Sequence, residues 1–146
     1  MVAMGCEVHG FDPSIGKKSG KWGERHFFHQ MGVGGEDKTY APGKLPYAWP
    51  GGSKLDRRTR NKEKKTKTPW TLRTIPTIMK LLSHTKVAVL KFDVEGFEWY
   101  LLEQILTDKS FVKRICSGEL VIDQIVTRLP PSPRARTHYV SACRSS

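Results

Sequence analysis

Residues 87–99 read VAVLKFDVEGFEW, and this stretch decides the predicted fold. An apolar run ends at acidic residues and passes directly into an amphipathic helical pattern, which is typical of a parallel strand followed by a helix. Asp93 and Glu95 would then lie at the carboxyl end of the strand, where open α/β sheets place their ligands. Gly96 allows the sharp turn that leads into the helix. The stretch therefore predicts an α/β fold with a site at this edge of the sheet.

The composition fits one domain of ordinary size. The chain has 146 residues, of which 38% are hydrophobic, and this suffices for a modest core. No apolar run reaches the roughly 18 residues that a membrane-spanning helix requires. The three cysteines, Cys6, Cys116 and Cys143, are widely separated and match no metal-ligand spacing. We therefore expect no metal site and three free thiols.

Much of the formal net charge of +11 is concentrated in one polar stretch, residues 54–67, KLDRRTRNKEKKTK. Two interpretations are open: a solvated loop, or an arm that binds an anionic partner such as a phosphate group. Aromatic residues do not alternate with the basic ones, which argues against a nucleic-acid recognition module. The charge alone therefore predicts no particular partner.

The second half of the chain alternates between helical and strand patterns. The elements are expected at residues 75–83 (helix), 87–93 (strand), 97–106 (helix), 109–115 (short helix) and 119–127 (strand). Such alternation favours right-handed crossovers and a doubly wound, mostly parallel sheet.

The first half carries weaker patterns. Residues 6–11 and 26–31 predict two short strands. Residues 38–68 show neither a helical nor a strand period, which indicates a long basic insertion. Residues 128–146 are rich in Pro, Ser and Arg, and two interpretations compete: a disordered tail, or an altered carboxyl terminus in place of further strands. The expected organisation is one partial domain over residues 1–127 followed by a disordered tail.

The order of several segments resembles proteins related to the FkbM methyltransferases. These segments are CEVHGFDPS (6–14), HFFHQMGVGG (26–35), TLRTIPTIMKLL (71–82), VAVLKFDVEGFEW (87–99) and VIDQIV (121–126). The resemblance implies a Rossmann-like domain that uses S-adenosylmethionine, and it does not specify the methyl acceptor. The alternative is an unrelated α/β protein with similar strand ends.

The resemblance also suggests roles for individual residues. Asp12, at the end of a strand, is placed to accept hydrogen bonds from both ribose hydroxyls of the cofactor, or else to form an Asx turn with its neighbours. Gly32 and Gly34 permit close backbone approach to the cofactor, although a flexible turn explains them equally well. Asp93 and Glu95 are implied to border the cofactor and the acceptor. There a carboxylate balances the sulfonium charge, orients the acceptor or acts as a general base.

Two further side chains have weaker assignments. We expect Glu98 to face solvent or to pair with a basic neighbour such as Lys91, in preference to a catalytic role. His26 and His29 flank a short apolar segment, and a metal site would need more ligands than these two. We expect them to be structural or exposed, with a place for His29 near the site as the alternative.

The ends of the sequence depart from the family pattern. Enzymes of this fold open with a strand and a glycine-rich turn, but only MVAMG precedes the segment that begins at Cys6. After Thr127 the chain runs into Arg128, Leu129, Pro130 and Pro131 in place of a further patterned segment. These departures suggest a fragment, a splice form or an incomplete gene model.

Three functional alternatives therefore stay open at this point. The chain is a cofactor-binding methyltransferase, or an inactive form that lacks parts of the cofactor site. The third alternative is a non-catalytic protein that binds an anionic partner through its basic stretch.

Overall fold

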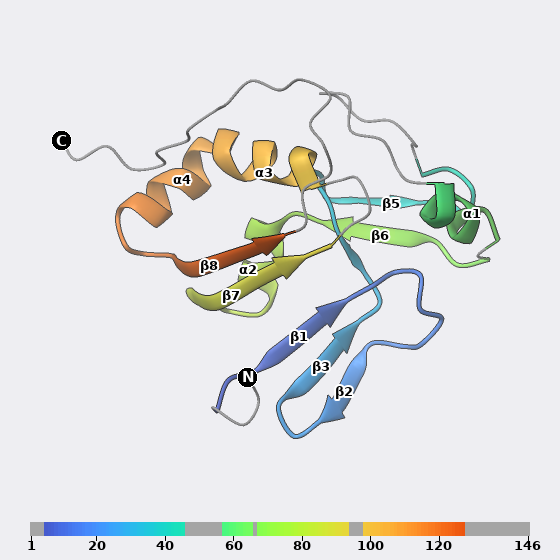
Figure 1. Cartoon of the computed structure of the whole chain (residues 1–146), viewed down its shortest axis with the longest axis horizontal. Helices are drawn as coiled ribbons and strands as arrows, with labels where there is room; N and C mark the ends of the chain where they lie inside the picture. Colours follow the sequence, from blue (N-terminus) through green and yellow to red (C-terminus); the bar gives the residue numbers. More distant parts are fainter. Residues whose placement is uncertain (1–4, 46–56, 66, 94–97, 128–146) are drawn as a thin grey trace. The chain divides into compact units, whose positions relative to one another are not determined.

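The computed structural model describes residues 5–45, 57–65, 67–93 and 98–127 (Figure 1). The described residues form two compact units. The amino-terminal unit contains the described residues up to Thr74, and the carboxy-terminal unit begins at Ile75.

The first sheet of the amino-terminal unit is mixed. It contains β1 (Val8–Phe11), β2 (Gly20–Gly23) and β3 (His26–His29) in the order β1-β3-β2. β1 runs parallel to β3, whereas β2 pairs with β3 in the antiparallel direction. Only two residues connect β2 to β3, and so short a connection permits only a hairpin.

The second sheet of this unit is also mixed. It contains β4 (Gly32–Val33), β5 (Lys38–Tyr40) and β6 (Trp70–Arg73) in the order β4-β6-β5, with β4 parallel and β5 antiparallel to β6. Tyr40, Trp70 and Leu72 are each at most 6% exposed and form the buried part of this sheet. Helix α1 (Arg57–Lys65) has no apolar stripe, and its described side chains are exposed.

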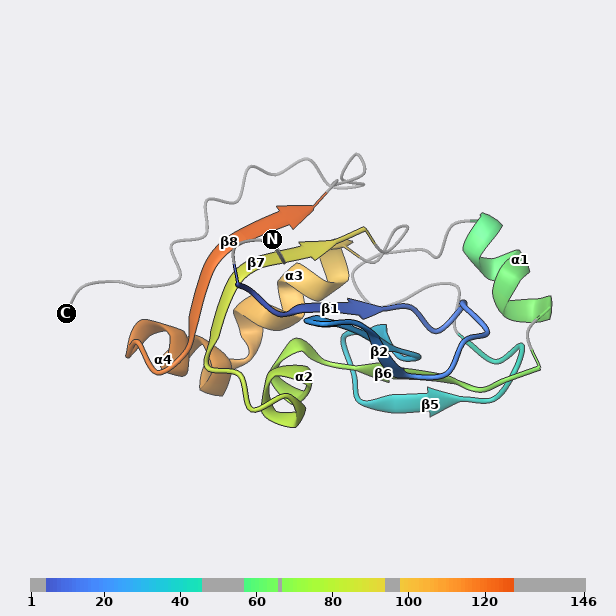
Figure 2. The same cartoon turned by 90° about the horizontal axis from the view of Figure 1, so that it is seen from below.

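The carboxy-terminal unit alternates between helices and strands. Its elements are α2 (Ile75–Leu81), β7 (Lys86–Phe92), α3 (Glu98–Thr107), α4 (Lys109–Cys116) and β8 (Val121–Thr127). β7 and β8 form a parallel pair, seen side by side in Figure 2.

The buried side chains of the carboxy-terminal unit come from its helices, from Phe92 at the end of β7 and from the residue before β8. Leu101, Phe111 and Leu120 are each 1% exposed. Asp108 caps α4, because its Oδ1 accepts hydrogen bonds from the amides of Ser110 and Phe111, both at 3.0 Å. None of the helices in the described part of the chain is long and apolar enough to cross a membrane.

The predicted doubly wound, mostly parallel, Rossmann-like sheet is wrong. The described strands form three small sheets, two of which contain antiparallel pairs, so the fold is α/β only in a broad sense. The reason lies in the first half. The two-residue connection between β2 and β3 permits only a hairpin, and β5 pairs in the antiparallel direction with β6, which follows much later in the chain. The proposed insertion at residues 38–68 also contains β5 and α1, which had no counterpart in the prediction.

Two other expectations can be compared with the structure. Cys6 has a free thiol as expected, whereas Cys116 takes part in a disulfide, so the expectation of free thiols is wrong for Cys116. The predicted tail at residues 128–146 lies outside the described residues.

The turn after α2 yields a prediction about stability. Ser83 has a φ of 55°, in the left-handed region, while its amide bonds to the Lys80 carbonyl and the His84 amide to the Met79 carbonyl. This is a Schellman-type helix end, where glycine avoids the steric cost of a Cβ. We expect Ser83→Gly to raise the free energy of unfolding by about 0.5–1 kcal/mol in a urea titration.

Ser117 provides the matched control, since it ends α4 with a φ of −80°, in the right-handed region. Ser117→Gly gains nothing from relief of strain and is expected to lower stability. Equal effects of the two substitutions would contradict the explanation from backbone conformation.

Candidate functional site

Asp12 lies directly after β1, where the backbone leaves the sheet. Its amide donates to the His29 carbonyl at 3.2 Å, and its Oδ1 accepts the Ser14 amide at 2.7 Å, which forms an Asx turn. No donor within the described part of the chain contacts its other carboxylate oxygen. The turn therefore orients the half-buried carboxylate and leaves lone pairs for a hydroxyl ligand.

Gly32 and Gly34 lie where Leu72 leaves no space for a side chain. A Cβ at Gly32 would lie 2.7 Å from the Leu72 Cδ2 and 3.2 Å from the Pro13 Cγ. A Cβ at Gly34 would lie 2.9 Å from the Leu72 Cβ. Both glycines thus have a packing role, and their backbone approach to a cofactor stays a prediction. Because Pro13 contacts Gly32, the structure brings the Asp12 turn and β4 together.

Asp93 follows β7 at its carboxyl end and is exposed, as the strand pattern predicted. Glu95 lies outside the described residues. The proposed roles of both carboxylates stay predictions.

Glu98 is buried, contrary to the expectation that it faces solvent. It is the first residue of α3 and is only 2% exposed. Glu98, Leu101 and Ile105 have the spacing of one helix face, and all three are buried. That spacing is the signal in the sequence that would have placed Glu98 inside. A buried carboxylate thus begins the helix that follows Asp93 and Glu95.

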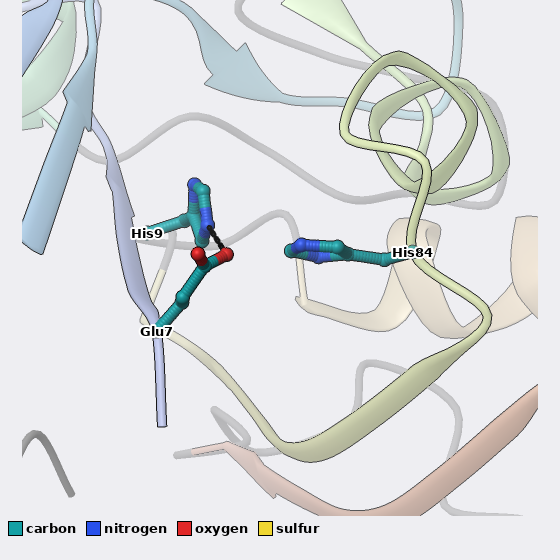
Figure 3. A group of neighbouring side chains, drawn as sticks. All are labelled: Glu7, His9 and His84. Carbon is teal, nitrogen blue, oxygen red and sulfur yellow. Dashed lines mark hydrogen bonds and ion pairs between the residues drawn. The ribbon is translucent and has the colours of Figure 1, made fainter. Parts of the chain in front are cut away.

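A pair of histidines lies beside Asp12 on β1 and β3. The His9 Nδ1 and the His29 Nε2 are 3.0 Å apart. The Glu7 Oε2 lies 3.4 Å from the His9 Nε2, the contact drawn as a dashed line in Figure 3. The His29 ring stacks on Phe11 with centroids 4.7 Å apart. The His29 carbonyl accepts the Asp12 amide, so His29 lies beside Asp12, and a place for His29 near a functional site stays a prediction.

The histidine pair makes stability depend on pH. Burial lowers the pKa of His29 below its usual 6.5, and the neighbouring His9 lowers it further. Below pH 6.5 the unfolded chain takes up a proton that the folded chain resists. We therefore expect the contribution of His29 to the free energy of unfolding to be greatest above pH 6.5 and to fall as the pH decreases. Urea titrations at pH 7.5 and 5.5 measure this change.

Two variants separate this effect from general acid sensitivity. His29→Phe keeps a ring on Phe11 and is expected to lose less stability on acidification than the wild-type chain. His26→Phe alters the same strand, but the His26 ring lies edge-on to Trp22, with ring centroids 6.0 Å apart. It should retain the wild-type dependence, and identical pH dependence of all three proteins would contradict the assignment to His29.

The family model for the methyltransferase FkbM domain matches residues 1–125. The chain belongs to the FkbM methyltransferase domain family. No curated protein and no solved structure matches the chain. The predicted family is thus confirmed, and the chain is methyltransferase-like. Asp12, Gly32 and Gly34 all lie within the matched FkbM region, as does Asp93.

Proposed function

We propose that this FkbM-family chain binds S-adenosylmethionine and takes part in transfer of its methyl group to an acceptor. The observation that carries the proposal is the Asp12 carboxylate at the end of β1. Its Oδ1 accepts the Ser14 amide, which orients the carboxylate, and its remaining lone pairs can accept further hydrogen bonds. A carboxylate in this position at a strand end suits a ribose with two adjacent hydroxyls. The residues that are present therefore fit the nucleoside part of the cofactor.

The proposed roles divide between two places in the chain. Asp12 accepts hydrogen bonds from the ribose, and Gly32 and Gly34 offer backbone without side chains next to the Asp12 turn. The bound cofactor supplies an electrophilic methyl group on a sulfonium. Asp93, exposed at the end of β7, orients the acceptor or removes a proton from it, and Glu95 shares this proposed role.

Calorimetric titration of the full chain with S-adenosylmethionine tests the proposal. We expect saturable binding at one site, with competition from S-adenosylhomocysteine. No saturable binding of either compound would contradict the proposal and favour the inactive form.

We also propose a second, non-catalytic candidate function, which one observation favours. Among the side chains of helix α1 that the structure describes, four are basic and exposed: Arg57, Arg58, Lys64 and Lys65. An anionic partner would release counterions from such a surface, so binding should fall steeply as salt increases. Replacement of the four residues by Gln is expected to abolish retention on heparin, and unchanged retention would reject this candidate.

A further inference from the structure

A pocket of the carboxy-terminal unit lies at the end of α2 and borders the beginning of β7, whereas Asp93 follows the end of that strand. It encloses about 400 Å³ and is lined by Met79, Lys80, Ser83, His84, Thr85 and Arg114. Its walls come from the end of α2, the turn into β7, and α4. A pocket of this size accommodates a small organic molecule.

The lining of the pocket has the chemistry of an anion site. Lys80 and Arg114 supply positive charge, Ser83 and Thr85 supply hydroxyl groups, and no lining residue is acidic. Within the described residues, no carboxylate lies in ion-pair distance of Lys80. Such a set of donors suits a ligand with several oxygen acceptors and negative charge.

The backbone hydrogen bonds hold these groups in place before any ligand arrives. The His84 amide bonds to the Met79 carbonyl at 2.8 Å, and the Thr85 carbonyl accepts the Val121 amide at 2.9 Å. The Arg114 Nε donates to the Glu119 Oε1 at 2.5 Å, which orients the guanidinium and leaves its terminal amino groups for another acceptor. Preorganisation of this kind lowers the entropic cost of binding.

Ser83 adds an independent observation. It occupies a left-handed position that glycine fills at lower cost, and it is one of the residues that line the pocket. Strained positions of this kind cluster at ligand-binding sites.

We propose that this pocket binds the phosphate group of a small phosphorylated molecule. β7 spans seven residues, so at about 3.3 Å per residue its two ends lie roughly 20 Å apart. The pocket borders the beginning of β7, whereas Asp93 follows its end. The phosphate site is therefore separate from the proposed methyl-transfer residues and does not depend on them.

Amide NMR spectra of the full chain, titrated with inorganic phosphate at constant ionic strength, test the proposal. We expect saturable shifts at Ser83, His84 and Thr85 that chloride does not reproduce. Ribose 5-phosphate should bind more tightly than phosphate if the natural ligand is organic, and equally tightly if free phosphate is the ligand. Neutral ribose should produce no shifts.

Three variants complete the experiment, of which Lys80→Gln and Lys113→Gln remove the same charge. Lys80→Gln should weaken phosphate binding about threefold, as expected for one exposed ion pair, and Lys80→Gln with Arg114→Gln should abolish it. Lys113→Gln removes an exposed lysine of α4 that does not line the pocket, and it should leave binding unchanged. Absence of saturable shifts, or an equal loss in Lys80→Gln and Lys113→Gln, would overturn the proposal.

Discussion

We expect the Asp12→Ala variant to bind S-adenosylmethionine about 10- to 100-fold more weakly than the wild-type chain, since hydrogen bonds to a charged group contribute about 1.5–3 kcal/mol. The variant loses the carboxylate proposed to accept both ribose hydroxyls. It also loses the acceptor of the Ser14 amide, so a small decrease in stability accompanies the loss of affinity. Calorimetry measures the affinity, and a urea titration measures the stability.

Two further variants distinguish ligand binding from the role in the turn. Asp12→Asn retains an Oδ1 acceptor for Ser14 but loses the charge, so its affinity should fall while its stability stays close to wild type. Asp37→Ala is the matched control, because the Asp37 Oδ1 also accepts a backbone amide, that of Thr74, at 2.8 Å. Unchanged affinity in both Asp12 variants, or an equal loss in Asp37→Ala, would remove Asp12 from the site.

The second large effect is expected from Gly34→Ala, which should lower the free energy of unfolding by about 1–3 kcal/mol through overpacking. The new Cβ would lie 2.9 Å from the Leu72 Cβ, an atom that no rotamer change can move away. Gly32→Ala should cost less, since its nearest contact is the terminal Leu72 Cδ2. Urea titrations without ligand measure both variants.

Gly10→Ala provides the control, because the nearest atom to a Cβ there is the Phe27 carbonyl oxygen at 3.9 Å. It should be tolerated. In a Leu72→Gly background, which removes the Leu72 Cβ, the cost of Gly34→Ala should shrink, as expected for two side chains in direct contact. An undiminished cost in that background would contradict the steric explanation.

The carboxy-terminal unit could be predicted well because its elements carry strong periodic patterns. The helix expected at residues 75–83 is observed as α2 (Ile75–Leu81), and the strand expected at 87–93 is β7 (Lys86–Phe92). Parallel pairing of β7 with β8 also agrees with the predicted strand order. Such elements can be recognised in the sequence because their apolar residues recur over a stretch long enough to show a helical or strand period.

The amino-terminal unit could not be predicted to the same degree. β2, β4 and β5 have two to four residues each and consist mainly of Gly, Lys and other polar residues, so no period distinguishes them from loops. β2 and β5 pair in the antiparallel direction and β4 pairs in parallel, and the overall alternation of strands and helices does not reveal these pairings. The prediction of one parallel sheet failed for this reason.

Some features of the candidate site could be predicted from the sequence, and others could not. The Asx turn at Asp12 follows from the local sequence Asp-Pro-Ser, and one of the two expected alternatives is indeed present. The contact between His9 and His29 joins residues 20 positions apart and depends on the register of β1 with β3. The burial of Glu98 was not predicted because a charged side chain was expected to face solvent, although its helical spacing places it on the buried face of the helix.

The central claim is that the nucleoside of the cofactor binds at the end of β1. An amide NMR titration of the full chain with S-adenosylhomocysteine tests it most directly. We predict saturable shifts of the Asp12, Ser14, Gly32 and Gly34 signals. In the Asp12→Asn variant, the affinity for S-adenosylhomocysteine that these shifts report should be lower. Saturable shifts confined to other residues, or none at all, would contradict the claim.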